Sequence, residues 1–125
     1  STGAPFASAQ DAAPATTGPV TVEIAFGTDV DRAERTLVGE ATSFPADIAK
    51  VYCFTRIEGI AGTDTVTHAW YHEGRTMARV DLPVRSPDWR TWSSKRLLPG
   101  WRGPWEVKVL DRTGKVLAAG GFELE

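Results

Sequence analysis

Apolar and polar residues alternate along several short stretches of the chain, and this period of two predicts β-strands. The first stretch, VTVEIAF at residues 20–26, places four apolar side chains on one face: Val20, Val22, Ile24 and Phe26. Residues 50–57, KVYCFTRI, are apolar on both faces, as expected of a central strand. Residues 28–47 have no clear period, so we expect a helical turn or an irregular edge there, with Pro45 limiting strand pairing.

The second half of the chain contains two hairpin signals. Residues 64–84 read DTVTHAWY-HEGR-TMARVDLPV, and the Glu-Gly pair in the middle suits a tight turn with positive φ angles. Residues 105–124 read WEVKVL-DRTG-KVLAAGGFEL, with Gly114 at the left-handed position of the turn. The first of these strands is predicted to point three side chains inward: Trp105, Val107 and Val109.

Short strands at regular spacing, without a long helical pattern, indicate an all-β protein. We predict an immunoglobulin-like antiparallel β-sandwich of about seven strands, with a small β-barrel as the alternative. Residues 20–125 form the predicted sandwich domain. Residues 1–19 are rich in Ala, Pro, Ser and Thr, and we interpret them as an extended N-terminal tail or linker whose only large apolar residue is Phe6.

Composition narrows the range of partners. The formal net charge of -2 argues against general nucleic-acid binding, and the chain has no apolar stretch long enough to span a membrane. Charge is uneven, since residues 75–115 carry ten Lys/Arg and four Asp/Glu. Oppositely charged regions of neighbouring copies could therefore attract one another. The Ala/Pro/Thr-rich start is typical of an exported protein, so we expect an extracytoplasmic location.

The strand phrases also resemble a known family. VYCFTRIEG, HAWYHEGR, DWRTWSSKRLLPG, GPWEVKVLDRTGKVL and the closing GGFEL occur in an order that is similar to the DUF "twenty-nine-fourteen" group, a bacterial family of unknown function. The resemblance covers about residues 51–124. It implies a small extracytoplasmic β-domain and supplies no catalytic residues.

No arrangement of residues indicates catalysis or a cofactor. Ser94 and Lys95 are consecutive strand residues, so their side chains point to opposite faces and cannot act as a pair. His68 and His72 lie about 13 Å apart along an extended strand, too far to share one metal ion, and we expect ordinary polar strand positions. Asp29 and Asp31 have the spacing of a calcium loop without its glycine and closing glutamate. We expect neither an enzyme nor a metal site, and a buried, inert thiol at Cys53, in the apolar run VYCF.

Four of the five tryptophans lie in residues 89–105, WRTWSSKRLLPGWRGPW. Alternation places Trp89 and Trp92 on opposite faces of a strand, one in the core and the other among basic side chains. Trp101 lies in a loop and is the hardest tryptophan to explain as core. The candidate contact residues are therefore Trp92 and Trp101 with three arginines: Arg90, Arg96 and Arg102.

An exposed tryptophan bordered by arginine suits three partners: a glycan or peptidoglycan, a second protein, or the protein's own arginines stacked on the rings. We expect a non-catalytic structural or interaction protein that assembles with copies of itself into an oligomer or filament. In this hypothesis residues 1–19, with Phe6 as an anchor, pack on a neighbouring copy. The alternative is a carbohydrate- or cell-wall-binding module that uses the exposed Trp and Arg residues.

Overall fold

The alternating stretches fold into strands, and the computed structural model describes residues 20–125 of the chain. Seven of the strands have seven or more residues, in agreement with the predicted number. They are β2 (Thr21–Gly27), β6 (Lys50–Glu58), β7 (Asp64–His72), β8 (Arg75–Val84), β9 (Asp88–Arg96), β10 (Gly103–Leu110) and β11 (Val116–Leu124). Three shorter ones complete the described set: β3 (Asp29–Asp31), β4 (Thr36–Val38) and β5 (Ser43–Phe44).

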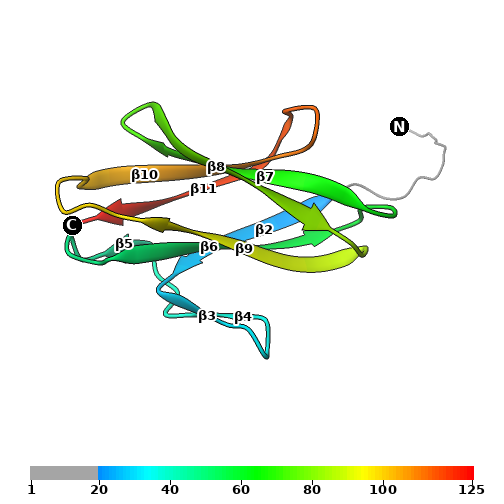
Figure 1. Cartoon of the computed structure of the whole chain (residues 1–125), viewed down its shortest axis with the longest axis horizontal. Helices are drawn as coiled ribbons and strands as arrows, with labels where there is room; N and C mark the ends of the chain where they lie inside the picture. The colour runs from blue at the N-terminus through cyan, green and yellow to red at the C-terminus, as the bar shows by residue number, and fades with distance from the viewer. Residues whose placement is uncertain (1–19) are drawn as a thin grey trace, which may run out of the picture.

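Eight of the described strands form two sheets packed face to face, and β3 and β4 pair only with each other (Figure 1). One sheet has the order β2-β6-β9 and the other has the order β5-β11-β10-β7-β8. The neighbours are antiparallel except for β5, which runs parallel to β11. This arrangement is an immunoglobulin-like β-sandwich, and the sheets do not close into the alternative barrel.

The core lies between the two sheets and follows the predicted alternation. Trp105, Val107 and Val109 point inward and are buried, and Val51, Cys53 and Ile57 do the same from the central strand β6. Trp70, which lies outside the tryptophan-rich stretch, is fully buried. Gly120 faces this core opposite β2, where an added Cβ would lie 3.0 Å from the Ile24 side chain, so a side chain there would require Ile24 to shift.

The turns carry the expected backbone angles. Glu73 and Gly74 between β7 and β8 have φ values of 53° and 77°, and Gly114 before β11 has a φ of 91°. Two positive φ angles in succession match the right-handed twist of a two-residue hairpin. The hairpin predictions are therefore confirmed.

Of the two alternatives predicted for residues 28–47, the helical turn is wrong. Instead of a helical turn, the structure has the hairpin β3–β4, which lies against the outer side of the three-stranded sheet, followed by the short edge strand β5 (Figure 1). The Asp31 carboxylate accepts hydrogen bonds from the amides of Ala33 (3.0 Å) and Glu34 (3.1 Å), which fixes the turn between the two strands. Strands of three residues are too short to leave a readable period in the sequence.

Candidate functional site

The outward face of the three-stranded sheet carries a row of three side chains from its three strands. Ala25 of β2 pairs with Phe54 of β6, and Phe54 pairs with Trp92 of β9. The rings of Phe54 and Trp92 are stacked, with centroids 5.8 Å apart and planes 6° from parallel. Trp92 is thus the outward tryptophan, whereas Trp89 packs against the core beside Ile57.

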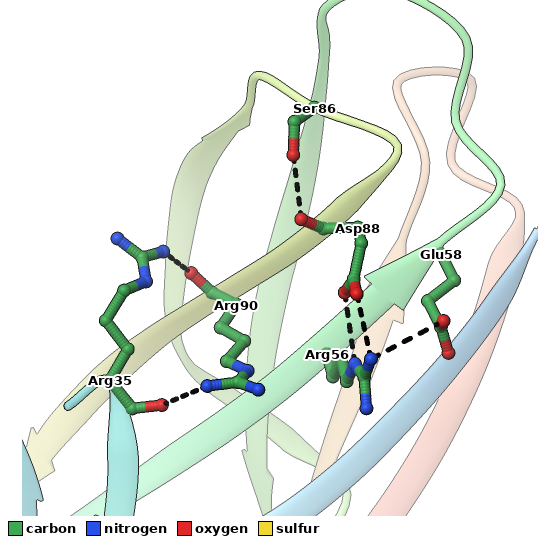
Figure 2. A network of polar contacts seen from close by, with 6 residues as sticks. All are labelled: Arg35, Arg56, Glu58, Ser86, Asp88 and Arg90. Atoms are coloured by element: carbon green, nitrogen blue, oxygen red, sulfur yellow. Dashed lines mark hydrogen bonds and ion pairs between the residues drawn. The ribbon is translucent and has the colours of Figure 1, made fainter.

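An arginine from the hairpin lies over the rings of Trp89 and Trp92. The Arg35 guanidinium lies 4.9 Å from the ring centroid of Trp89 and 5.5 Å from that of Trp92. Arg35 and Arg90 exchange hydrogen bonds, each guanidinium donating to the backbone carbonyl of the other residue (Figure 2). These contacts join the turn between β3 and β4 to the open side of β9. They match the alternative in which the protein's own arginines stack on its tryptophan rings. The stacking arginine is Arg35, which is not one of the three predicted arginines.

Arg56 lies beside Phe54 on the same face and is held in one orientation. Its guanidinium donates to both carboxylate oxygens of Asp88, at 3.0 and 2.8 Å, and lies 3.7 Å from the Glu58 carboxylate (Figure 2). The hydrogen bonds to Asp88 raise the pKa of Arg56 and lower the pKa of Asp88. Such a bidentate pair fixes the plane of the guanidinium.

A groove of about 360 Å³ opens between the hairpin and this face of the sheet. It is lined by three charged residues and four apolar ones: Glu23, Glu40, Arg56, Ile24, Ala25, Leu37 and Phe54. Its hairpin wall is held close because Gly27 has no side chain, and an added Cβ would lie 2.5 Å from the Val38 carbonyl. The groove is a feature of the fold and not of the tryptophan-rich stretch.

Trp101 lies elsewhere and was expected to be a surface ring. It is half-buried against the core, with its ring 5.8 Å from that of Trp105, and its carbonyl accepts a 3.0 Å hydrogen bond from the Trp105 indole. The Lys95 ammonium lies 5.2 Å from the Trp101 ring centroid. The expectation of a free ring is therefore corrected, because folding of its loop back over β10 makes Trp101 a rim of the core.

The five predicted contact residues do not gather at one place. Arg90 and Trp92 share the outward face of β9 with Arg96, which is exposed at the end of the strand opposite Lys50. Arg102 is exposed in the loop next to Trp101. The two tryptophans share none of their stacking partners, so a single surface of all five residues is not formed. The predicted tail anchor, Phe6, lies outside the described residues.

The histidines are buried and not ordinary polar strand positions. His68 and Ser93 lie between the sheets, with the imidazole Nδ1 2.6 Å from the Ser93 hydroxyl and Nε2 3.2 Å from the Thr55 hydroxyl. Thr55 donates its own proton to the Thr91 carbonyl at 2.9 Å, and the Trp70 indole donates to the Ser93 oxygen at 3.2 Å. One direction of donation satisfies every group: Trp70 to Ser93, Ser93 to His68, His68 to Thr55.

His68 is held neutral by its burial. Burial lowers the pKa of His68 to about 4. A serine next to a histidine resembles a nucleophile and its base, but Ser93 is only 7% exposed and His68 is fully buried, and a threonine takes the place of an orienting carboxylate. This series of hydrogen bonds therefore satisfies buried polar groups and holds the two sheets in register.

The other candidate ligands are also occupied by structural contacts. His72 stacks on Trp105 at 4.6 Å, and its Nε2 donates to the Arg102 carbonyl at 2.9 Å. Cys53 is fully buried, and burial raises the pKa of its thiol. No group of three metal-ligating side chains occurs within residues 20–125. Over that same range no helix is long and apolar enough to cross a membrane.

Sequence reasoning missed the residues that shape the groove. Leu37 and Glu40 come from the stretch that the sequence leaves without a clear period, and Glu23 lies on a predicted strand. Arg35 contacts β9 across 55 positions of sequence. Phe54 was the one residue that could have indicated a contact on this face, because an aromatic side chain on the outward face of a central strand needs a covering partner.

Comparison with known proteins supports the sequence resemblance. Residues 63–124 match the model of a family described as "Protein of unknown function (DUF2914)". Residues 63–124 belong to this family. The DUF2914 match runs from the loop before β7 to the end of β11, so it contains β9 and four strands of the larger sheet. The phrase VYCFTRIEG, in β6, lies outside the matched range.

Two further comparisons add little to the DUF2914 assignment. Comparison with curated proteins finds no match. The crystal structure of a selenomethionine-labelled β-glucosidase from Kluyveromyces marxianus is similar at a TM-score of 0.44 and 11% identity, over 86% of this chain and 14% of that chain. The chain thus spans only a small part of the length of that enzyme.

Proposed function

We propose that this protein is a non-catalytic assembly module, in which residues 1–19 of one copy add as a strand to β11 of another. The observation that carries the proposal is the open edge of the larger sheet. Within residues 20–125, β5 pairs with β11 only at Glu123 and Leu124, and nothing pairs with that edge from Val116 to Phe122.

The open edge presents regularly spaced hydrogen-bonding groups. The amides of Glu123 and Glu125 donate towards β5, to the carbonyls of Thr42 and Phe44, both at 2.9 Å. Because successive residues of a strand direct their backbone groups to opposite sides, Ala119 and Gly121 direct their N–H and C=O groups to that same open side. An added strand would pair with these groups.

The open part of β11 lacks the features that protect other edges. Its sequence, VLAAGGF at residues 116–122, contains no charge and no proline. At the opposite edge of the sheet β8 carries Arg75, Arg79 and Pro83, which discourage pairing. A long, uncharged edge of small residues is an acceptor for a further strand.

The N-terminal segment has the position and length to be that strand. It is followed by Val20, which leads into β2 at the end of the sandwich where β11 begins (Figure 1). Val20 and Val116 are among the most exposed large apolar residues described, at 38% and 48%. Nineteen extended residues span roughly 60 Å, and seven residues of β11 span about 23 Å, so the segment can reach a neighbouring copy. The segment's Ala/Pro/Thr-rich composition places the assembly outside the cytoplasm in this proposal.

The test compares two substitutions at one position of the full-length chain. Ala119→Pro removes the amide that faces the open edge and leaves the β10 pairing groups intact, whereas Ala119→Leu keeps that amide. Light scattering and negative-stain microscopy over a concentration series measure assembly. We expect the natural chain and Ala119→Leu to form larger species as concentration rises, and Ala119→Pro and Phe6→Ser to remain smaller.

Either of two results would overturn the proposal. One is a natural chain that stays monomeric at every concentration. This is also the result expected if residues 1–19 pair with β11 of the same copy. The other is assembly of Ala119→Pro equal to that of Ala119→Leu. Circular dichroism of each variant separates a blocked edge from a lost fold.

The alternative, a carbohydrate-binding module built on Trp92 and Trp101, has weaker support from the geometry. Phe54 and Arg35 contact the first ring, and Trp105 and Lys95 contact the second. Neither ring is left without a partner inside the protein.

A further inference from the structure

We infer that the groove between the β3–β4 hairpin and the outward face of the three-stranded sheet is a saccharide-binding site, with Phe54 as its stacking platform. This inference is independent of the assembly proposal, because the groove lies on the smaller sheet and the open edge belongs to the larger one. It also differs from the predicted contact set, since neither Trp92 nor Trp101 lines the groove.

The platform follows from the strand register. Trp92 covers one face of the Phe54 ring, and the planes are nearly parallel. On the other side of Phe54 the paired residue of β2 is Ala25, whose methyl group fills little space. The second face of the Phe54 ring is therefore open to the groove. A flat ring of C–H groups, such as one face of a pyranose, packs well on an open aromatic face.

Polar groups line the same groove. Glu23 pairs in register with Arg56, two positions along from the Ala25–Phe54 pair and on the same face. The Glu23 and Glu40 carboxylates have no hydrogen bond or ion pair within the part of the chain that the structure describes, so both can accept hydrogen bonds from hydroxyls. Arg56 uses its Nε and one terminal nitrogen for Asp88 and Glu58, which leaves donors on the other terminal nitrogen.

The groove is built by the backbone and not by chance contact of side chains. The Thr28 amide donates to the Val38 carbonyl at 3.0 Å, and the Ala41 amide donates to the Phe26 carbonyl at 3.0 Å. Together with the close approach at Gly27, these bonds hold the hairpin wall, and Leu37 with it, beside the sheet. A volume of about 360 Å³ is within the range of small-molecule sites.

The mixture of groups selects the class of ligand. An organic cation would meet the fixed Arg56 guanidinium, and a purely apolar ligand would remove the two carboxylates from water without replacing their hydrogen bonds. A saccharide offers an apolar ring face for Phe54, donors for the carboxylates and acceptors for Arg56. It is the ligand class that satisfies all three parts of the groove.

The test is a titration of the full-length protein followed by backbone amide NMR. The probes are glucose, N-acetylglucosamine and their β-1,4-linked oligosaccharides, with spermidine as a cationic probe. We expect oligosaccharides to shift the amides of Ala25, Phe54 and Arg56. Ala25→Leu fills the open side of Phe54 and is expected to weaken binding by about tenfold or more. Glu23→Gln is expected to weaken it by a smaller factor.

The matched control is Ala119→Leu, the same change at an outward position of the other sheet, and it is expected to bind with unchanged affinity. Three results would each overturn the inference: no probe saccharide shifts the groove amides, Ala25→Leu and Glu23→Gln both bind as the natural chain does, or spermidine shifts these amides and saccharides do not. The amide spectrum of each variant reports directly whether it is folded.

Discussion

At the centre of the β6–β9 strand pair, the two faces reverse the usual distribution of residues in a sandwich. The inward face carries Thr55 and Ser93, which belong to a buried polar chain, and the outward face carries Phe54 and Trp92. Each reversal is stabilised by a specific arrangement. The buried hydroxyls are satisfied by one directed series of hydrogen bonds, and the outward rings are covered by each other and by Arg35.

The two faces differ in how much stability is lost when one side chain is removed. A buried donor without an acceptor loses its hydrogen bond to water and gains nothing, so the inward arrangement tolerates no missing member. An outward ring without its cover is merely exposed to solvent. We therefore expect the inward face to govern stability and the outward face to be free to serve binding.

The largest expected effect is at Ser93, the centre of the polar chain. Ser93→Ala leaves both the Trp70 indole and His68 Nδ1 without a partner, and is expected to lower the free energy of unfolding by about 4 kcal/mol. Urea denaturation followed by tryptophan fluorescence measures it. The control is Ser94→Ala, the exposed neighbour on the outward face, which is expected to change stability by less than about 0.5 kcal/mol. Equal effects at the two serines would contradict the comparison.

The next effect is a dependence of stability on pH that comes from His68. The native state keeps this imidazole neutral down to a pKa of about 4, while the unfolded chain binds a proton near its ordinary value of 6.5. The free energy of unfolding should therefore fall by about 3 kcal/mol between pH 7 and pH 4.

Urea titrations across that interval measure the pH effect, and His68→Gln should reduce its slope. A natural protein whose stability is constant from pH 7 to pH 4.5 would show that His68 is not held neutral. The pKa of Asp88 is lowered by Arg56, so its own contribution is lost only at lower pH.

On the outward face, Trp92→Ala removes the ring that stacks on Phe54. Because Trp92 is half-buried, the expected loss is about 2 kcal/mol, smaller than for a core tryptophan. Thermal denaturation compared with Trp70→Ala measures the difference. A larger loss at Trp92 than at the fully buried Trp70 would mean that the outward face, and not the core, limits stability.

The smallest effect is expected for Arg35, whose guanidinium lies over the rings of Trp89 and Trp92. Arg35→Gln removes the cation from Trp89 and Trp92 and is expected to cost about 1 kcal/mol or less. Acrylamide quenching of tryptophan fluorescence should increase, because the rings become more accessible. The control is Arg32→Gln, which changes an exposed arginine on the same hairpin. Equal quenching in the two variants would show that Arg35 does not shield the rings.

The sequence predicts the parts of this fold that depend on local alternation. It places Trp105 inward, finds the Glu73–Gly74 turn and places Trp89 and Trp92 on opposite faces. It does not decide which of the two tryptophans is outward. That choice depends on the register with β6, which puts Trp89 opposite Ile57 and Trp92 opposite Phe54.

The missed features depend on contacts between distant segments. His68 and Ser93 read as polar strand residues, and only the packing of one sheet on the other brings their side chains within hydrogen-bond distance. Arg35 and Leu37 belong to a hairpin whose strands have three residues each. Alternation cannot be recognised over so few positions, so neither the hairpin nor the groove beneath it was predicted.

The burial of Cys53 has a practical consequence. The protein's single thiol is fully enclosed, and its raised pKa keeps it in the unreactive protonated form. A cysteine introduced at a surface position would then be the sole site for a maleimide dye or spin label, with no native residue to replace first. Labels placed on the hairpin and on β11 would allow distance measurements within one molecule and between copies.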